Sequence, residues 1–88
     1  MPDLAHAHRF GVKLRTLRTR QRLTTRRLAA QLGTSGGYLS NVENGKVTPN
    51  IDFALRVAHF FNVSTDLLLR DELDLDSEEA TTNTDETP

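Results

Sequence analysis

The feature that most limits how this chain can fold is a helical repeat of apolar residues that is interrupted at short intervals. Phe10, Leu14 and Leu17 are spaced as one face of a helix, and comparable spacing recurs in four later stretches without strand-like alternation. An interrupted repeat of this kind predicts an all-α fold, a compact bundle of five short helices around one core.

Residues that favour helix ends divide these stretches. Thr24, Ser35 and Ser64 are suited to begin helices, because their side-chain oxygens accept hydrogen bonds from the first free amides. Gly33 and Gly45 are suited to end them. We therefore expect helices over residues 7–21, 24–32, 35–44 and 51–61, with Asn62 as a left-handed cap, and a short fifth helix beginning at residue 64.

The same periodicity predicts which side chains face the core. For the first helix we expect its apolar stripe inside, with Lys13, Arg15, Arg20 and Arg22 facing solvent. The inward positions expected in the later helices are Leu28, Ala29, Leu32, Leu39, Val42, Leu55, Ala58, Phe61, Leu67 and Leu68.

Charge divides the chain at residue 70. Residues 1–70 hold all 11 Lys and Arg against four acids, a net charge of +7, whereas residues 71–88 hold eight acids and no base. This asymmetry is typical of a basic nucleic-acid-binding domain followed by an acidic tail. We expect an N-terminal arm over residues 1–6, a folded domain over residues 7–70 and a tail over residues 71–88.

The tail contains two leucines and no aromatic residue, so it is predicted to be disordered unless a helix continues over residues 71–75. It could be a solubilising end, a strip that competes with DNA for the basic face, or a docking segment for a protein partner.

Several classes of protein are disfavoured by composition. Without cysteine the chain has no disulfide or thiolate metal site, and no window of about 20 apolar residues predicts a membrane span. No signal peptide is recognisable, which favours a cytoplasmic location. His6 and His8 are interpreted as an ordinary terminus rather than a metal clip, and no catalytic motif is present. We expect a non-enzyme without metal or cofactor.

The second and third helices, joined by a tight glycine-containing turn, have the spacing of a helix-turn-helix. Residues 14–67 resemble the lambda-repressor-like (Cro/Xre-type) helix-turn-helix family. The matching residues are Leu14, Arg15, Leu17 and Arg18, then Leu23-Thr24 with Leu28-Ala29, then residues 32–35, Leu39-Ser40, residues 42–46, Pro49, Leu55, Ala58 and residues 61–64.

The resemblance implies that the third helix enters the major groove of double-stranded DNA while the second crosses the backbone. The side chains and amides expected to face bases are those of Ser35, Gly36, Gly37, Tyr38, Ser40 and Asn41. The two glycines depart from the family pattern and carry no side-chain code, so readout rests on Asn41, which can bond bidentately to adenine, on Ser40 and on DNA shape. Alternatively, Tyr38 packs against the second helix.

Phosphate contacts are expected at both ends of this motif. The free amides of Thr25 and Arg26 suit an anion, although arginines there could also form an ordinary solvated face. The expected phosphate-contacting residues are Arg15, Thr25, Arg26, Asn44, Lys46 and Thr48. Arg18 and Glu43 match a paired arginine and glutamate of the family. Arg22 replaces a frequent glycine, so either the first helix ends differently or a strained arginine contacts phosphate.

Tight specific binding by so small a domain calls for pairing, and we expect a homodimer. Candidate interface residues are Phe53, Val57, Phe60 and Leu69, with burial in the core as the alternative. We expect a sequence-specific transcriptional regulator, a repressor that binds a palindromic operator. The alternative is a protein-interaction module, an antitoxin or anti-repressor, that uses the acidic tail. The chain could also be part of a larger protein.

Overall fold

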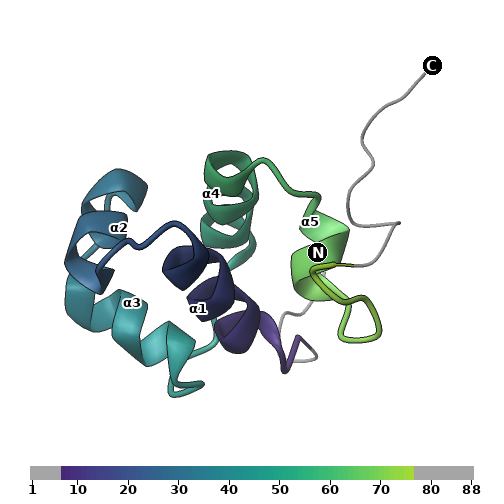
Figure 1. Cartoon of the computed structure of the whole chain (residues 1–88). Coiled ribbons are helices and arrows are strands. Elements are labelled where there is room, and N and C mark those ends of the chain that lie inside the picture. Colours follow the sequence, from purple (N-terminus) through teal and green to yellow (C-terminus); the bar gives the residue numbers. More distant parts are fainter. Residues whose placement is uncertain (1–6, 77–88) are drawn as a thin grey trace.

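The computed structural model describes residues 7–76, which contain five α-helices and no strand. The helices are α1 (Phe10–Arg20), α2 (Thr25–Leu32), α3 (Gly36–Glu43), α4 (Ile51–Phe61) and α5 (Thr65–Leu69). In Figure 1, α1 lies between the α2–α3 pair on one side and α5 on the other. The predicted all-α, five-helix fold is confirmed. None of the described helices has the length and apolar character needed to cross a bilayer.

Local capping residues set most helix ends. The side chains of Thr24, Ser35, Asn50 and Ser64 each accept a hydrogen bond from the backbone amide three residues later. Gly33 and Asn62 end α2 and α4 in the left-handed conformation, as predicted.

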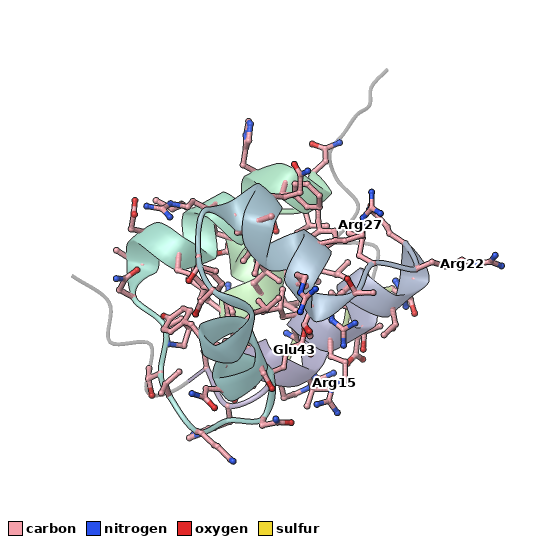
Figure 2. All side chains as sticks on the ribbon, turned by 90° about the vertical axis from the view of Figure 1, so that its left-hand side faces the viewer. Arg15, Arg22, Arg27 and Glu43 are labelled. Atoms are coloured by element: carbon pink, nitrogen blue, oxygen red, sulfur yellow. The ribbon has the colours of Figure 1, made fainter. Side chains whose placement is uncertain are left out.

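Arg22 also adopts the left-handed conformation, with φ at 58°. The amides of Arg22 and Leu23 donate to Thr19 O and Arg18 O, a closure that resembles the one at Gly33. The interpretation in which α1 avoids a left-handed arginine is therefore wrong. The Arg22 side chain is exposed and extends into solvent (Figure 2).

The core is formed by one apolar stripe from each helix. Its members are Phe10, Leu14, Leu17, Leu28, Ala29, Leu32, Leu39, Val42, Phe53, Ala54, Val57, Ala58, Phe61 and Leu68, and Leu67 is buried as well. The prediction for Leu55 was wrong, because its side chain is 51% exposed. On α4 the inward stripe passes through Phe53 and Val57 instead.

Lys13 was expected to face solvent, but only 1% of its surface is exposed. Its ammonium Nζ donates to Leu67 O at 2.6 Å and to Arg70 O at 2.9 Å. Leu67 O lies in the last turn of α5, where carbonyls lack helical partners, and Arg70 O, just past the helix, also accepts from the Leu73 amide. The lysine thus ties α1 to the end of α5. Burial is the main cause that lowers the pKa of Lys13.

Residues 71–76, called here the C-terminal strap, run along α1 in turns. Asp71 accepts hydrogen bonds from the amides of His8 and Arg9 at 3.0 and 2.9 Å, and so caps the start of α1. Leu75 packs against the core. These six residues form turns, so the helix considered over residues 71–75 is not present. The rest of the expected tail, residues 77–88, lies outside the described residues, as does the N-terminal arm.

Candidate nucleic-acid interface

The turn between α2 and α3 brings the first turns of both helices together. Thr34 donates its amide to Ala29 O at 2.9 Å, and Gly33 supplies the left-handed residue that reverses the chain. A Cβ placed on Gly36 would lie 3.9 Å from the Cα of Arg26. The start of α3 therefore lies beside the start of α2, so both helix N-termini border the same surface.

The N-terminus of α2 offers two backbone donors. Thr24 takes the amide of Arg27 at 3.1 Å, which leaves the amides of Thr25 and Arg26 without an acceptor among residues 7–76. The side chains of Arg26 and Arg27 are exposed beside these amides. Free amides, a helix dipole and two guanidinium groups together form a site suited to a phosphate.

The expected base-contacting residues divide by exposure. Ser35, Gly37 and Asn41 are exposed, whereas Gly36, Tyr38 and Ser40 are half-buried. The Tyr38 ring packs edge-on against Phe53 of α4, with centroids 5.3 Å apart, so its partner is α4 rather than the second helix considered above. Asn41 is thus the exposed amide side chain on α3 with two donors and an acceptor to offer.

Ser40 and Asn44 are linked by a 3.4 Å hydrogen bond from Asn44 Nδ2 to Ser40 Oγ. Asn44 Oδ1 also accepts from Arg15 Nη2 at 2.6 Å. Two expected phosphate-contacting residues, Arg15 and Asn44, therefore meet each other. Lys46 and Thr48, which follow α3, are exposed.

Arg18 and Glu43 form a two-point ion pair between α1 and α3. Arg18 Nε and Nη2 lie 2.7 and 3.0 Å from the two carboxylate oxygens, and the Glu43 side chain is only 2% exposed. Arg18 Nη1 also donates to Leu23 O in the α1–α2 turn. The hydrogen bond to Glu43 is the main cause that raises the pKa of Arg18. The pair links the C-terminal end of α3 to α1.

Exposed basic residues at this surface differ from those in the rest of the described domain in having no acidic partner. Most arginines elsewhere have an acidic partner: Arg9 pairs with Asp74, Arg15 and Arg18 with Glu43, Arg20 with Asp76, Arg56 with Asp52, and Arg70 with Glu72. Arg22, Arg26, Arg27 and Lys46 pair with no carboxylate among residues 7–76 and are exposed. These four, called here the unpaired cations, border α2 and α3.

Sequence reasoning gave Arg26 and Arg27 a role in adding positive charge at the start of the second helix, but it did not recognise the unpaired cations as a set. The unpaired cations are recognised by having no acidic partner. Which arginines have such a partner depends on contacts between residues distant in sequence, such as those of Asp74 and Asp76 with Arg9 and Arg20. Among the described residues, no group of three or more His, Asp or Glu side chains is placed to hold a metal ion.

None of the four side chains expected at the dimer interface is fully exposed. Phe53 and Val57 are buried, which matches the core alternative, and Phe53 contacts both Phe10 and Tyr38. Phe60 and Leu69 are half-buried and pack against the core cluster.

Two capped helices joined by a glycine turn, with free amides and unpaired cations along one surface, define a helix-turn-helix DNA-binding domain. Residues 9–73 match the helix-turn-helix domain family, and the chain belongs to it. It is 41% identical over 63 residues to the HTH-type transcriptional activator BcrR of Enterococcus faecalis, a match covering 72% of this chain and 31% of that protein. The chain thus spans about a third of the length of this curated relative.

Proposed function

We propose that this chain regulates transcription by binding a specific DNA sequence, with α3 in the major groove. Asn41 and Ser35 face the base edges, and Asn41 bonds bidentately to an adenine. Ser40 and the exposed backbone at Gly36 and Gly37 add contacts that depend on close approach or on water. Tyr38, held against Phe53, contributes the edge of its ring at most.

The observation that supports this proposal most strongly is the grouping of the unpaired cations around α2 and α3. Phosphates would bind at the amides of Thr25 and Arg26 and at Lys46 and Thr48, on opposite ends of the helix pair. Arg15 and Asn44, already bonded to each other, form a positioned pair that can share one phosphate oxygen.

A homodimer on a palindromic operator is part of the proposal. Two copies would place their α3 helices in successive major grooves about 34 Å apart. Because Phe53 and Val57 are buried, the interface would use the partly exposed side chains of Phe60 and Leu69 on α4 and α5.

Repression is the proposed sign of regulation, because occluding a promoter requires only DNA binding. Activation requires a further contact with the transcription machinery. The relative BcrR is an activator, so activation is the second candidate for this chain. A reporter assay with the selected operator placed upstream of, or overlapping, a promoter separates the two.

The first experiment is selection of bound duplexes from a random DNA pool at near-physiological salt. An enriched inverted repeat with half-sites about one helical turn apart is expected. Absence of enrichment would contradict sequence-specific binding and would favour the protein-interaction alternative, an antitoxin or anti-repressor.

Charge variants then test the assigned surface. Arg26→Gln and Lys46→Gln should each reduce the slope of log affinity against log salt by about 0.9. Arg70→Gln is the matched control, since Arg70 is exposed at the end of α5 and pairs with Glu72. If the slope for Arg70→Gln fell as much as the other two, DNA binding would depend on total charge rather than on the assigned surface.

A further inference from the structure

Ser40 on α3 stands at the end of a chain of hydrogen bonds that begins at a buried carboxylate. Glu43 accepts from Arg15 Nε at 3.4 Å, and Arg15 Nη2 donates to Asn44 Oδ1 at 2.6 Å. Asn44 Nδ2 in turn lies 3.4 Å from Ser40 Oγ. Arg18 holds the same Glu43 carboxylate through two bonds. The chain therefore leads from the contact between α1 and α3 to a side chain expected to face DNA.

The arginine fixes the direction of every later bond in this chain. A guanidinium has five donors and no acceptor, so the Asn44 atom that meets Arg15 has to be the carbonyl oxygen. The amide nitrogen of Asn44 then faces Ser40, and it can only donate. Ser40 Oγ is consequently the acceptor of that bond, and its own proton remains to be donated elsewhere.

The Ser40 proton has no acceptor among residues 7–76. Other hydroxyls of the domain donate to their own helix, as Thr16 Oγ1 does to Val12 O at 2.9 Å and Thr19 Oγ1 does to Thr16 O at 3.1 Å. Within the described residues, the bond from Asn44 is the one side-chain hydrogen bond that Ser40 makes. A half-buried hydroxyl with an unused proton favours a ligand that brings an acceptor.

Two glycines leave the space in front of this hydroxyl open. A helical side chain leans toward the N-terminus of its helix, over the residues three and four positions earlier. For Ser40 these are Gly37 and Gly36, and a Cβ on Gly37 would meet nothing within 4 Å. A base edge can therefore approach Ser40 Oγ without meeting a side chain from that turn. The two glycines that carry no code of their own thus uncover the hydroxyl that follows them.

We propose that Ser40 reads its base only as a hydrogen-bond donor, and that Arg15 and Asn44 are positioning residues that impose this direction. In the major groove guanine, adenine and thymine each present an acceptor, whereas cytosine presents its N4 amino donor. Ser40 therefore rejects cytosine on the strand that it faces. A serine without this constraint can donate or accept and makes no such distinction. This inference rests on the proposed function, since it assigns a base preference to the same α3 surface.

The first test compares the sequences that the wild type and Ser40→Ala select from a random DNA pool. The position whose preference relaxes in Ser40→Ala is the one that Ser40 reads. At that position the wild type should disfavour cytosine about five- to thirtyfold, the effect of one unmatched donor at a base edge. A wild type that accepts cytosine there as readily as the other bases, or a Ser40→Ala variant that relaxes no position, would overturn the proposal.

The second test reverses the direction of the bond with Asn44→Asp. A carboxylate only accepts, so it still binds Arg15 but now takes the proton of Ser40, whose lone pairs are then presented to the base. The preference should shift toward the amino groups of cytosine and adenine. In the Ser40→Ala background the same substitution should leave the base preference unchanged. A wild-type preference in Asn44→Asp would contradict the positioning role of Asn44.

Two further comparisons separate base preference from charge. Lys46→Gln changes the charge by the same one unit, just beyond the end of α3, and should weaken binding to all duplexes without altering the preference. A shift equal to that of Asn44→Asp would reject the proposal. The preference against cytosine should weaken in Arg15→Met and persist in Arg15→Lys, because lysine also only donates. Loss of the preference in both variants, or in neither, would contradict the role of Arg15.

An NMR measurement on the full chain without DNA separates this inference from the proposed function. Nuclear Overhauser contacts between the Asn44 Nδ2 protons and the Ser40 Hβ protons are expected, and their absence would overturn the inference whether or not an operator is found. An operator selected without a preference against cytosine would overturn the inference alone. Failure to select any operator would overturn the proposed function, and the base reading with it.

Discussion

At the scale of single residues, Asp71 shows how a distant side chain completes a helix. The residue at the N-cap of α1, Arg9, makes no side-chain capping bond, and the carboxylate of Asp71 accepts from the amides of Arg9 and His8 instead. The bond from Arg9 is the main cause that lowers the pKa of Asp71.

This lowered pKa fixes the sign of a pH effect. A carboxyl whose pKa is lower in the folded chain stabilises the fold fully above its unfolded pKa, about 3.9. This stabilisation is lost as the pH falls through the pKa of the folded chain. Asp71→Ala should therefore lower the free energy of unfolding by about 1 kcal/mol at pH 7. In urea titrations the difference from wild type should shrink below about pH 4. Asp74→Ala, in an exposed pair on the same strap, should have little effect, and an equal loss there would contradict the capping role.

Two glycines make a second comparison at this scale. A Cβ on Gly11 would lie 2.8 Å from Glu43 O and closer still to Val42 O, where α1 crosses α3. Gly11→Ala should cost about 1–3 kcal/mol of stability, because backbone would have to move. A Cβ on Gly37 meets nothing within 4 Å, so Gly37→Ala should stabilise α3 by about 0.5–1 kcal/mol. Denaturation midpoints measure both, and a tolerated alanine at residue 11 would show that the crossing can widen.

At the scale of elements, the Arg18–Glu43 pair sets how α3 lies on α1. A buried pair roughly cancels its own desolvation cost, whereas removing one partner leaves the other charge uncompensated. We expect Arg18→Met and Glu43→Met each to destabilise the domain, and the double variant to be more stable than their sum predicts. The coupling energy from urea titrations should be about 1–3 kcal/mol. A coupling near zero would mean that the contact does not orient α3.

The helix limits were predictable because their signals are local. Thr24, Ser35 and Ser64 cap helices they immediately precede, and Gly33 and Asn62 end helices they immediately follow. Such bonds form between residues three or four apart, so the sequence pattern contains both partners.

What the sequence could not predict depends on partners far along the chain. Lys13 is buried because the α5 carbonyls lie 54 and 57 residues away in sequence, and nothing local indicates them. On α4 two apolar stripes overlap, and only packing against Phe10 and Tyr38 selects the one through Phe53 over Leu55. The helix-turn-helix motif was predictable for the same reason as the helix limits, since it is a local arrangement of caps.

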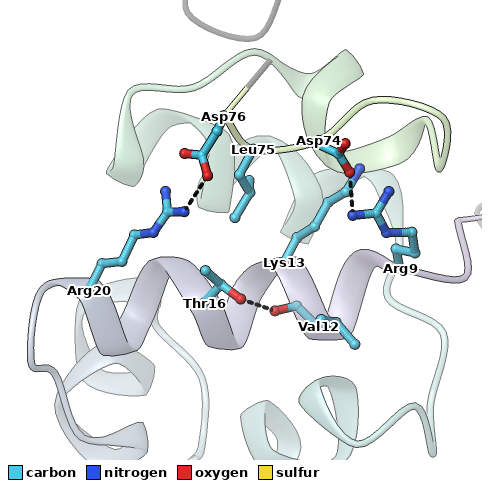
Figure 3. A pocket seen from close by; sticks show the side chains of 8 residues that line it. All are labelled: Arg9, Val12, Lys13, Thr16, Arg20, Asp74, Leu75 and Asp76. Atoms are coloured by element: carbon cyan, nitrogen blue, oxygen red, sulfur yellow. Dashed lines mark hydrogen bonds and ion pairs between the residues drawn. The ribbon is translucent and has the colours of Figure 1, made fainter.

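At the scale of the molecule, the acids of the strap decide which arginines of the fold have an acidic partner. Residues 7–76 contain all 11 Lys and Arg but seven acids, a net charge of +4. Two acids of the strap pair with Arg9, the N-cap of α1, and Arg20, its last residue, on the side of that helix that faces the strap (Figure 3). The positive charge that remains unpaired is therefore concentrated beside α2 and α3, although the whole chain carries a net charge of -1.

The folded unit should accordingly extend to residue 76 rather than 70. A chain ending at residue 76 should unfold with the same free energy as the full chain, because every described contact of the strap is kept. A chain ending at residue 70 loses the Asp71 cap and the packing of Leu75, and should be less stable by about 2–3 kcal/mol. Urea titrations of the three chains measure this. The full-length variant Asp71→Ala/Leu75→Ser should reproduce most of the loss, which separates the contacts of the strap from an effect of chain length. Equal stability of the chains ending at 70 and 76 would mean that the strap rests on α1 without supporting it.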